Sequence, residues 1–302
     1  MVRVLVTGAG GVCGSRVVAK LLELGHDVTA VAGRSGLGRL PAGGERLTTL
    51  VGDLCADDLP LPTEAQAVVH AAAQLPDPGV DVSGLVRSNV LATQRLVERA
   101  VSMGAHTFIY FSSLSVYGRI TGPQVDETTP ILDPEPYGLT KLLGERLVAD
   151  RADRLRSMAL RLPGVIGPGS RRNWLSRVME TARRGDEITL FQPEAPFNNA
   201  AHVDDVARFV GTLLDGDWTG ADAVTLAAAG MTSIEGAARA VVEGLGSRSP
   251  IAVRAHAGSS FTVSSARATQ RYGYAPMPIE AMLARFAREN AAGSTQGAGR
   301  CG

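Results

Sequence analysis

Near its start the sequence reads Val2-Arg-Val-Leu-Val-Thr-Gly-Ala-Gly-Gly-Val-Cys-Gly14, a β-branched apolar run that passes into a loop with glycines at positions 8, 11 and 14. The apolar run predicts a buried strand. The GxxGxxG spacing lets the backbone turn sharply and approach a pyrophosphate, while N–H groups at the start of the next helix point at the anion. Glycine also serves ordinary turns, but the strand–loop–helix setting favours a dinucleotide-binding loop.

Strand-like and helix-like segments alternate downstream of this loop. Such alternation predicts an α/β fold with a doubly wound, Rossmann-type parallel sheet. The predicted strands are Val2–Thr7, Asp27–Ala32, Leu47–Gly52, Ala67–Ala72, Thr107–Ser112 and Met158–Leu162. The predicted helices between them are Ser15–Leu24, Ser88–Met103 and Tyr137–Arg151.

The alternation loosens after Gly167-Pro-Gly169. We therefore predict a dinucleotide-binding core over 1–168 and a smaller, interleaved C-terminal substrate lobe over 169–290, with segments such as 202–214 returning to the core. In the lobe we expect helices at Trp174–Arg184, Val203–Leu214 and Ser233–Leu245 and a strand at Glu187–Phe191. The segment 291–302, rich in Gly, Ala and Ser, predicts a disordered tail.

Composition limits the classes of partner. Among 302 residues, 30 Lys and Arg balance 30 Asp and Glu, which removes the electrostatic case for a nucleic-acid or anionic-membrane partner. No apolar run reaches the roughly 18–20 residues that span a bilayer. The three cysteines form no metal-ligand or disulfide pattern, and the N-terminus lacks the pattern of a secretory leader. We expect a cytoplasmic protein with a small-molecule substrate and no metal site.

The end of the second predicted strand bears on the cofactor. An acidic residue there usually accepts a hydrogen bond from the adenine ribose 2′-hydroxyl of NAD. Here the position is Ala32, and Arg34 and Ser35 follow. A missing acid with a nearby guanidinium favours NADP(H). NAD(H) stays open, because Arg34 could equally be a solvated loop residue.

Tyr137 and Lys141 lie four residues apart and so share one face of the predicted helix. A free phenol has a pKa near ~10, and a nearby ammonium favours its ionised form. The pair could therefore transfer protons, although it could also be an accidental contact. Ser113 follows a predicted strand, at the sheet edge where doubly wound folds bind ligands, and this setting favours the catalytic interpretation.

Taken together, the motifs resemble those of the extended short-chain dehydrogenase/reductase superfamily, in the branch of NAD-dependent epimerases, dehydratases and ketoreductases. The similarity extends to about Arg288. The motifs, in order, are TGAGGVCG at 7–14, GDL at 52–54, VVHAAA at 68–73, SNVLAT at 88–93, FSSLSVYG at 111–118, PYGLTK at 136–141, LRLPGVIGPG at 160–169 and HVDDVA at 202–207.

The resemblance implies roles for individual residues. Ser113, Tyr137 and Lys141 would be catalytic, and Asn89 would support the architecture of the active site. The residues implied in cofactor binding are Gly8, Gly11, Val12, Cys13, Gly14, Arg34, Ser35, Asp53, Leu54, Ala71, Ala72, Ala73, Tyr137, Lys141, Pro163 and Val165. Those implied in substrate binding are Gln74, Ser113, Ser115, Tyr137, Gly164, Arg171, Asn173 and Asn198.

The sequence departs from the family pattern at substrate positions. Gly164 replaces an asparagine, and Asn198 replaces an arginine that grips the nucleotide diphosphate, which argues against a diphosphate-linked sugar. No carboxylate lies between Ser113 and Tyr117, where dehydratases of the superfamily carry an acid and a base, so we reject the dehydratase interpretation. His70 we interpret as a satisfied strand-end histidine rather than a metal ligand.

Three functions are compatible with these residues. The first is an NADP(H)-preferring carbonyl reductase acting on a sugar-like or nucleotide-sugar substrate, with Tyr137 as acid and base. The second is a nucleotide-sugar epimerase with tightly bound NAD. The third is a dinucleotide-sensing regulator, against which the complete set of catalytic residues argues. From the family we also expect a homodimer through the helices at 88–103 and 137–151.

Overall fold

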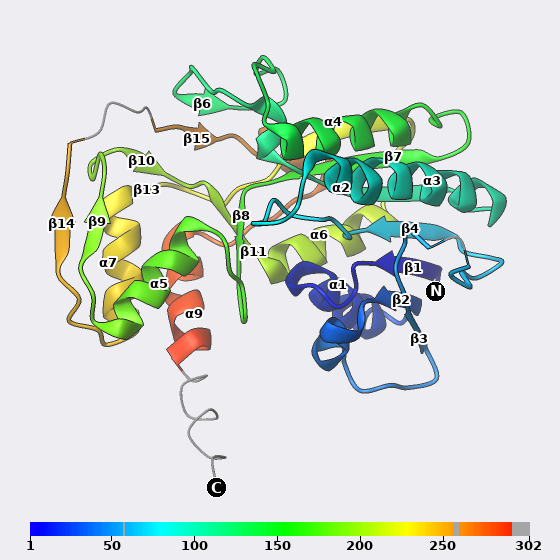
Figure 1. The fold of residues 1–302 in the computed structure, drawn as a ribbon, viewed down its shortest axis with the longest axis horizontal. Coiled ribbons are helices and arrows are strands. Elements are labelled where there is room, and N and C mark those ends of the chain that lie inside the picture. Colours follow the sequence, from blue (N-terminus) through cyan, green and yellow to red (C-terminus); the bar gives the residue numbers. More distant parts are fainter. Residues whose placement is uncertain (57, 256–259, 292–302) are drawn as a thin grey trace, which may run out of the picture.

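The predicted parallel sheet forms the centre of the molecule. The computed structural model describes residues 1–56, 58–255 and 260–291. Its largest sheet has seven parallel strands in the order β12-β7-β5-β4-β1-β2-β3 (Figure 1). They are β1 Arg3–Thr7, β2 Asp27–Ala32, β3 Leu47–Val51, β4 Ala67–His70, β5 Thr107–Ser113, β7 Arg156–Leu162 and β12 Ala221–Thr225. The strand order reverses between β1 and β4, which makes that point the expected ligand site.

Helices cover both faces of this sheet, as a doubly wound fold requires. Figure 1 shows α3 and α4 on one side of the strands and α1 and α6 on the other. Val17, Leu21 and Phe209 pack in the core on the α1 and α6 side, and Leu96 and Val148 pack in the core on the opposite side. The bounds are α1 Val12–Glu23, α3 Ala92–Ser102, α4 Pro136–Ala149 and α6 Val203–Asp215. The predicted Rossmann-type α/β fold is confirmed.

The helix predicted over Ser88–Met103 begins earlier and is not uniform. It consists of α2 (Val82–Val86), a π-helical turn η2 (Arg87–Leu91) and α3. The wider π turn contains Asn89, whose side chain is buried. Single π turns within α-helices are frequent at functional sites.

A second, smaller core lies beside the sheet. Leu175, Val241 and Phe286 pack together there, contributed by three helices. The helices are α5 Trp174–Arg184, α7 Ile234–Gly244 and α9 Ile279–Ala291. Short two-stranded sheets border this core and the cleft: β8 Gly164–Ile166 with β11 Ala200–His202, β9 Ile188–Leu190 with β14 Ile251–Val253, β10 Pro196–Phe197 with β13 Thr232–Ser233, and β6 Gln124–Val125 with β15 Thr262–Val263.

The structure adds elements that the sequence did not predict. These are β12, which completes the main sheet, the terminal helix α9, α8 (Ala266–Tyr272), and the short 3-10 segments η1 (Arg34–Arg39) and η3 (Leu114–Tyr117). The division of the chain at residue 168 stays a prediction. The predicted disordered tail lies outside the described residues, apart from Ala291 at the end of α9. Within the described residues, no helix is both long and apolar enough to cross a membrane.

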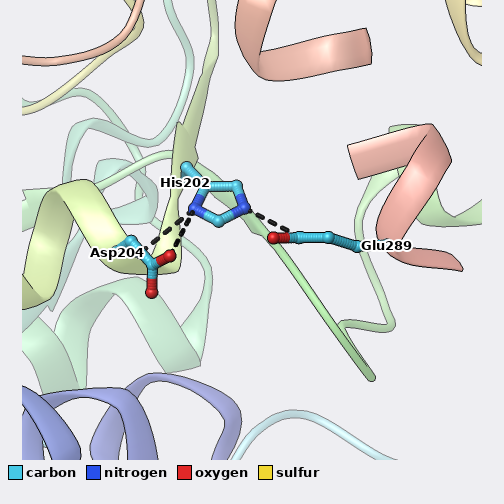
Figure 2. Close-up of side chains that lie close together, drawn as sticks. All are labelled: His202, Asp204 and Glu289. Carbon is cyan, nitrogen blue, oxygen red and sulfur yellow. Dashed lines mark hydrogen bonds and ion pairs between the residues drawn. The ribbon is translucent and has the colours of Figure 1, made fainter. Parts of the chain in front are cut away.

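A polar junction connects the smaller core to the main sheet (Figure 2). His202, buried at the start of α6, accepts a hydrogen bond from the Asp204 N–H at Nδ1 and contacts Glu289 of α9 through Nε2, at 3.0 Å. Arg16 of α1 donates to Asp204 at 2.6 Å, and Arg285 of α9 pairs with both carboxylates. Because arginines already pair with both carboxylates, we interpret this histidine–carboxylate cluster as a structural junction rather than a metal site.

The loop that follows β5 gives a test of packing. Gly118 has φ of +63°, and a Cβ there would lie 2.1 Å from the Leu132 carbonyl oxygen. We expect Gly118→Ala to lower the free energy of unfolding by about 2–5 kcal/mol, the sum of backbone strain and overpacking. Gly104→Ala is the matched control, because Gly104 also has positive φ (+74°) but has open space around it.

Chemical denaturation of the two variants and the wild type measures this difference. If Gly118→Ala were no less stable than Gly104→Ala, the close contact between η3 and residue 132 would be wrong.

Candidate active site

A cleft of about 430 Å³ lies beyond the carboxyl ends of β1, β4, β5 and β7. It brings together the glycine loop, the end of β5, the face of α4 that carries Tyr137 and Lys141, and the segment after β7. The predicted site residues that line it are Gly8, Gly11, Val12, Cys13, Gly14, Ala71, Ala73, Ser113, Tyr137, Lys141, Pro163, Gly164, Val165, Arg171 and Asn173. Residues far apart in the sequence thus meet at the sheet edge where doubly wound folds bind ligands.

The glycine loop is shaped by close backbone contacts. Gly8 has φ of +67°, and a Cβ there would lie 2.4 Å from the Ala72 amide nitrogen. A Cβ on Gly14 would lie 2.2 Å from the Gly8 carbonyl oxygen. Gly11 occupies the N-cap of α1, and no side chain caps that terminus. The N–H groups of the first turn of α1, at Val12 and Cys13, are therefore available to an anion, as a pyrophosphate site requires.

The predicted adenosine-end residues lie beside this loop. Arg34 and Ser35 are exposed at the start of η1. The η1 backbone packs directly on the glycine loop, because a Cβ on Gly36 would lie 2.6 Å from the Cα of Gly10. This contact brings in Arg39, whose guanidinium donates to the Gly10 carbonyl at 3.3 Å. Arg39 could not be predicted from the sequence, because its distance from the glycine loop depends on the course of η1.

Asp53 and Leu54 follow β3, as predicted for residues near the adenine. The Asp53 carboxylate accepts a hydrogen bond from the Cys55 N–H at 2.9 Å, and Leu54 packs against the apolar core behind the sheet. Their contact with an adenine stays a prediction.

Tyr137 and Lys141 both line the cleft from α4, and Tyr137 is partly buried. Lys141 is 2% exposed. Burial lowers the pKa of Lys141 to about 7, an effect that the Glu145 carboxylate partly offsets. Burial raises the pKa of Tyr137 to about 12, with Cys13 adding to the rise. The expectation that Lys141 lowers the tyrosine pKa is therefore wrong for the protein without ligand, because desolvation of the phenolate outweighs the neighbouring ammonium.

Ser113 and Ser115 form a local hydroxyl pair at the end of β5. The Ser113 hydroxyl donates to Ser115 Oγ at 3.1 Å and accepts from the Ser115 N–H at 3.1 Å. Ser113 lines the cleft, whereas Ser115 is exposed on η3 and does not line it. The geometry thus separates a cleft-facing hydroxyl from a supporting one.

Asn89 holds two segments of the active site together. Its side-chain oxygen accepts from the Gln74 N–H at 2.7 Å, and its amide donates to the Gln74 carbonyl at 2.9 Å and to Thr140 Oγ1 at 3.1 Å. Thr140 in turn donates to the Tyr137 carbonyl at 2.8 Å. Asn89 is therefore a positioning residue for α4 and for the loop after β4. The Gln74 side chain donates to the Leu75 carbonyl and does not line the cleft, so the predicted substrate contact of Gln74 has no geometric support.

His70 is buried and fully hydrogen bonded, which confirms the interpretation as a satisfied histidine. Thr93 donates to the Asn89 carbonyl, so it accepts from His70 Nε2, at 2.9 Å. The other ring nitrogen, Nδ1, then accepts from Thr7 Oγ1 at 2.6 Å. Burial lowers the pKa of His70 to about 3, with Lys141 adding to the shift, so the ring is neutral.

A larger cavity of about 720 Å³ adjoins the cleft and shares Gly164, Arg172 and Asn173 with it. Aromatic side chains line it, and two of them, Trp174 and Phe197, pack edge to face with ring centroids 5.1 Å apart. Three further polar or aromatic lining residues are Arg177, Phe191 and Asn199. The combination of flat apolar rings and arginines suits a ligand with an aromatic base and phosphates.

The predicted substrate residues after β7 differ in their environment. Asn173 caps α5, accepting from the Ser176 N–H at 2.8 Å and donating to the Val165 carbonyl at 2.9 Å. Arg172 pairs with Asp77 at 2.7 Å across the mouth of the cleft. Within the described residues, the Arg171 and Arg177 side chains form no hydrogen bond or ion pair, so both guanidinium groups are available to an anion.

The substrate contact predicted for Asn198 requires correction. Its side chain is 7% exposed, donates to the Val263 carbonyl at 2.8 Å and accepts from the Val263 N–H at 2.8 Å. Both ends of the amide are therefore satisfied by the β15 backbone. Asn198 connects β15 to the segment before β11 and does not face the cavity.

The cleft fits an extended ligand with a negatively charged middle. The glycines provide close backbone approach, and the uncapped N-terminus of α1 provides donors for phosphate oxygens. Within the described residues, the buried Lys141 ammonium makes no hydrogen bond or ion pair, so its three donors await acceptors such as ribose hydroxyls. These features match a nicotinamide dinucleotide.

Comparison with known proteins agrees with this geometry. Residues 4–223 match the model of the NAD dependent epimerase/dehydratase family. The chain is 33% identical over 181 residues to a UDP-glucose 4-epimerase of Erwinia amylovora, covering 54% of this chain and 53% of that protein. It is 34% identical over 163 residues to a dTDP-glucose 4,6-dehydratase of Streptomyces antibioticus, covering 47% of each. The matched region thus spans about half the length of these curated relatives.

Solved structures extend the similarity over nearly the whole chain. The structure of MoeE5 in complex with UDP-glucuronic acid and NAD superposes with a TM-score of 0.81 at 28% identity, covering 96% of this chain and 99% of that one. A UDP-glucuronic acid 4-epimerase from Bacillus cereus in complex with NAD has a TM-score of 0.83 at 22% identity, covering 95% and 98%. The second comparison concerns the fold alone.

The burial of Lys141 predicts an unusual stability profile. Because its folded-state pKa lies below that of the unfolded chain, the unfolded state binds more protons between about pH 7 and 10.5, and stability rises with pH across that window. We expect Lys141→Met to raise the free energy of unfolding of the ligand-free protein, by on the order of a few kcal/mol at pH 6 and by less at pH 9.

Urea denaturation at the two pH values measures the effect, with Lys20→Met as the control for a partly exposed lysine paired with Glu23 on α1. A Lys141→Met variant that is destabilised to the same degree at both pH values would contradict the charged, desolvated state of Lys141.

Proposed function

The chain belongs to the NAD dependent epimerase/dehydratase family, and on that premise we propose that it epimerises a nucleotide sugar, with a nicotinamide dinucleotide as cofactor. One observation carries the proposal. The cleft that holds Ser113, Tyr137 and Lys141 shares Gly164, Arg172 and Asn173 with a second cavity, which is lined by aromatic rings and arginines. A sugar in the first cavity and its nucleotide in the second would satisfy both sets of side chains.

The residues of the cleft divide the chemistry among them. A bound nicotinamide dinucleotide supplies hydride transfer to and from a substrate carbon. The Ser113 hydroxyl hydrogen bonds the substrate oxygen at that carbon and holds it against Tyr137. The Tyr137 hydroxyl, protonated at neutral pH, donates its proton when that oxygen becomes a hydroxyl and accepts it in the reverse direction. Lys141 binds ribose hydroxyls and brings positive charge to the phenol.

The cofactor would lie along the glycine loop. The N–H groups of Val12 and Cys13 would bind its pyrophosphate, and Ala71 and Ala73 would line the space for its nicotinamide half. The preference for NADP stays a prediction. It rests first on Ala32, whose side chain cannot accept a hydrogen bond from a ribose hydroxyl. It rests also on Arg34 and Arg39, whose positive charges could pair with a 2′-phosphate. Equal or tighter binding of NAD+ than of NADP+ in titration calorimetry would exclude this preference.

An epimerase is favoured over a carbonyl reductase by the relatives. The relative from Erwinia amylovora is a UDP-glucose 4-epimerase, and MoeE5 was solved with UDP-glucuronic acid and NAD. Both names point to nucleotide sugars, and the first also names epimerisation, whereas the first hypothesis from the sequence was an NADP(H)-preferring reductase. The replacements at Gly164 and Asn198 do not exclude such a substrate, because Arg172 and Arg177 offer charge to a diphosphate in the same cavity.

An eliminating enzyme, like the dehydratase relative, is less consistent with the site. None of the described residues that line the cleft is an aspartate or a glutamate. Glu145, the carboxylate nearest to the base of the cleft along α4, is buried and committed to Arg161 and Ser112. Elimination needs an acid and a base at the substrate carbons, and neither is provided here beyond Tyr137.

We also propose a homodimer. Leu91, Leu139 and Leu143 are 46–49% exposed on the helices over one face of the sheet, and a second copy of the chain could bury them symmetrically. Light scattering that gives a monomer mass at micromolar concentration would exclude this assembly. The cytoplasmic location and the absence of a nucleic-acid partner stay predictions.

Tyr137→Phe tests the proposed chemistry. We expect it to lower kcat for epimerisation of UDP-glucose or UDP-glucuronic acid by about 10²–10⁴-fold, since the proton donor is lost while the ring still fills its place. Product is measured by proton NMR of the sugar. Dinucleotide binding and melting temperature serve as the controls that the variant is folded.

Cofactor consumption distinguishes the alternatives. An epimerase converts the sugar with no net change in reduced nicotinamide absorbance, whereas a reductase consumes one reduced cofactor per product. Turnover by Tyr137→Phe at the wild-type rate would refute the assignment of Tyr137, and dinucleotide binding with no conversion of any nucleotide sugar would favour the sensing regulator.

Arg177→Met tests the proposed nucleotide cavity. Loss of a charge-assisted contact to phosphate costs about 1.5–3 kcal/mol, so we expect the Kd for UDP to rise about 10- to 100-fold. Arg239→Met is the control, because Arg239 pairs with Glu235 on the surface of α7. Calorimetry that gives the same Kd for UDP with Arg177→Met as with the wild type would remove Arg177 from the site.

A further inference from the structure

The environment of Lys141 contains a contact that the proposed chemistry does not use. The 302-residue sequence has two lysines, Lys20 and Lys141. Lys20 pairs with Glu23 on α1. Lys141 is 2% exposed, and its ammonium lies 4.2 Å from the centroid of the Tyr110 ring, which is itself fully buried on β5. An ammonium over a buried phenol ring at this distance is a cation–π contact in a desolvated setting, where such contacts are strongest.

The carboxylate closest in sequence to Lys141 is engaged elsewhere. Glu145, one turn further along α4, receives two hydrogen bonds from Arg161, at 3.0 and 2.8 Å, and one from Ser112 at 2.5 Å. It therefore acts on Lys141 only through space, and within the described residues Lys141 forms no ion pair.

The other titratable groups that face Lys141 are uncharged. Tyr137 on α4 stays protonated because burial raises its pKa to about 12. His70 on β4 is neutral, with both ring nitrogens hydrogen bonded. Burial also raises the pKa of Tyr110 well above its ordinary value, so that ring is a neutral phenol. The face of the Tyr110 ring therefore presents negative electrostatic potential to the Lys141 ammonium, 4.2 Å from the ring centroid.

The Tyr110 hydroxyl does not contribute to the contact with Lys141. Within the described residues it is buried without a hydrogen-bond partner. It projects against α4 at Gly144, where a Cβ would lie 2.1 Å from the hydroxyl oxygen. The absence of a side chain at Gly144 therefore lets the ring lie under the helix at Lys141, three residues earlier.

We propose that Tyr110 is a positioning residue that holds the Lys141 ammonium in place and in its charged form through the face of its ring, and not through its hydroxyl. This inference rests on the proposed function only for the importance of Lys141 to catalysis. The contact itself is a property of the ligand-free protein, and it can be measured without substrate.

The pKa of Lys141 can be measured directly by NMR because the sequence has only two lysines. Protein labelled with 13C at lysine Cε gives one signal from Lys20 and one from Lys141, and a pH titration by NMR reads both pKa values, with Lys20 as the internal reference. We expect Tyr110→Leu to lower the pKa of Lys141 by about half a unit to one and a half units, because the attraction to the ring is lost. Tyr110→Phe keeps the ring face and should leave that pKa within about 0.3 units of the wild type.

A graded series guards against misfolding of the leucine variant. Phenylalanines carrying one, two, three or five ring fluorines, placed at position 110, change the charge of the ring face with little change in size. We expect the pKa of Lys141 to fall stepwise with the number of fluorines. A flat series, or a rise of that pKa in Tyr110→Leu as water enters the space, would overturn the proposal.

Activity supplies a second readout. If charged Lys141 is needed for turnover, the alkaline limb of the kcat profile moves to lower pH in Tyr110→Leu and stays in place in Tyr110→Phe. Should no nucleotide sugar be converted, the proposed function fails while the NMR series still decides the role of Tyr110. Should the fluorine series be flat in an active enzyme, only the role of Tyr110 fails.

Discussion

The bidentate ion pair between Glu145 and Arg161 fixes the position of the helix on which the candidate chemistry depends. Glu145 lies on α4 and Arg161 on β7, and both side chains are about nine-tenths buried. Ser112 of β5 donates to the same carboxylate, and Arg161 also donates to the Tyr117 hydroxyl at 2.8 Å. Removing one partner from such a pair leaves an uncompensated buried charge. The pair therefore fixes α4 relative to two strands at once, and with it the direction in which Tyr137 and Lys141 point.

This arrangement also explains how a lysine can be buried without a carboxylate of its own. A direct ion pair would hold Lys141 firmly but would occupy the donors that a ribose needs. With Glu145 engaged by Arg161, the ammonium keeps its hydrogen-bonding capacity and is stabilised by longer-range charge and by the Tyr110 ring. Desolvation lowers the pKa of Lys141 because it disfavours the charged ammonium. Hydrogen-bond acceptors on a bound ligand would offset that cost. At the Tyr137 end of the helix, uncharged hydrogen bonds hold α4 in place: Asn89 donates to Thr140, and Thr140 donates to the Tyr137 carbonyl.

Local patterns in the sequence were sufficient for the strands of the main sheet other than β12, and the family resemblance supplied most of the residues that line the cleft. Glycine spacing and β-branched runs depend on neighbours in the chain, so β1 to β5 and the phosphate loop could be predicted. Residues whose role depends on contacts with distant segments of the chain could not be predicted in this way. Arg39 reaches the glycine loop only because Gly36 and Gly10 pack backbone to backbone. The Asn198 side chain forms its hydrogen bonds with Val263 of β15, 65 positions away, and so is not available to a substrate. The pKa of Tyr137 was misjudged for a related reason: helix spacing reveals the neighbouring ammonium, but desolvation depends on the whole fold.

The junction around His202 has a consequence for the order in which the molecule can be completed. Arg16 belongs to the helix whose first turn faces the phosphate site, and its partner Asp204 is held in turn by Arg285 of the last helix. During synthesis from the N-terminus the dinucleotide loop emerges first, whereas Asp204 of α6 and Arg285 of α9 emerge much later. A nascent chain can therefore form the early strands before the junction among α1, α6 and α9 is complete.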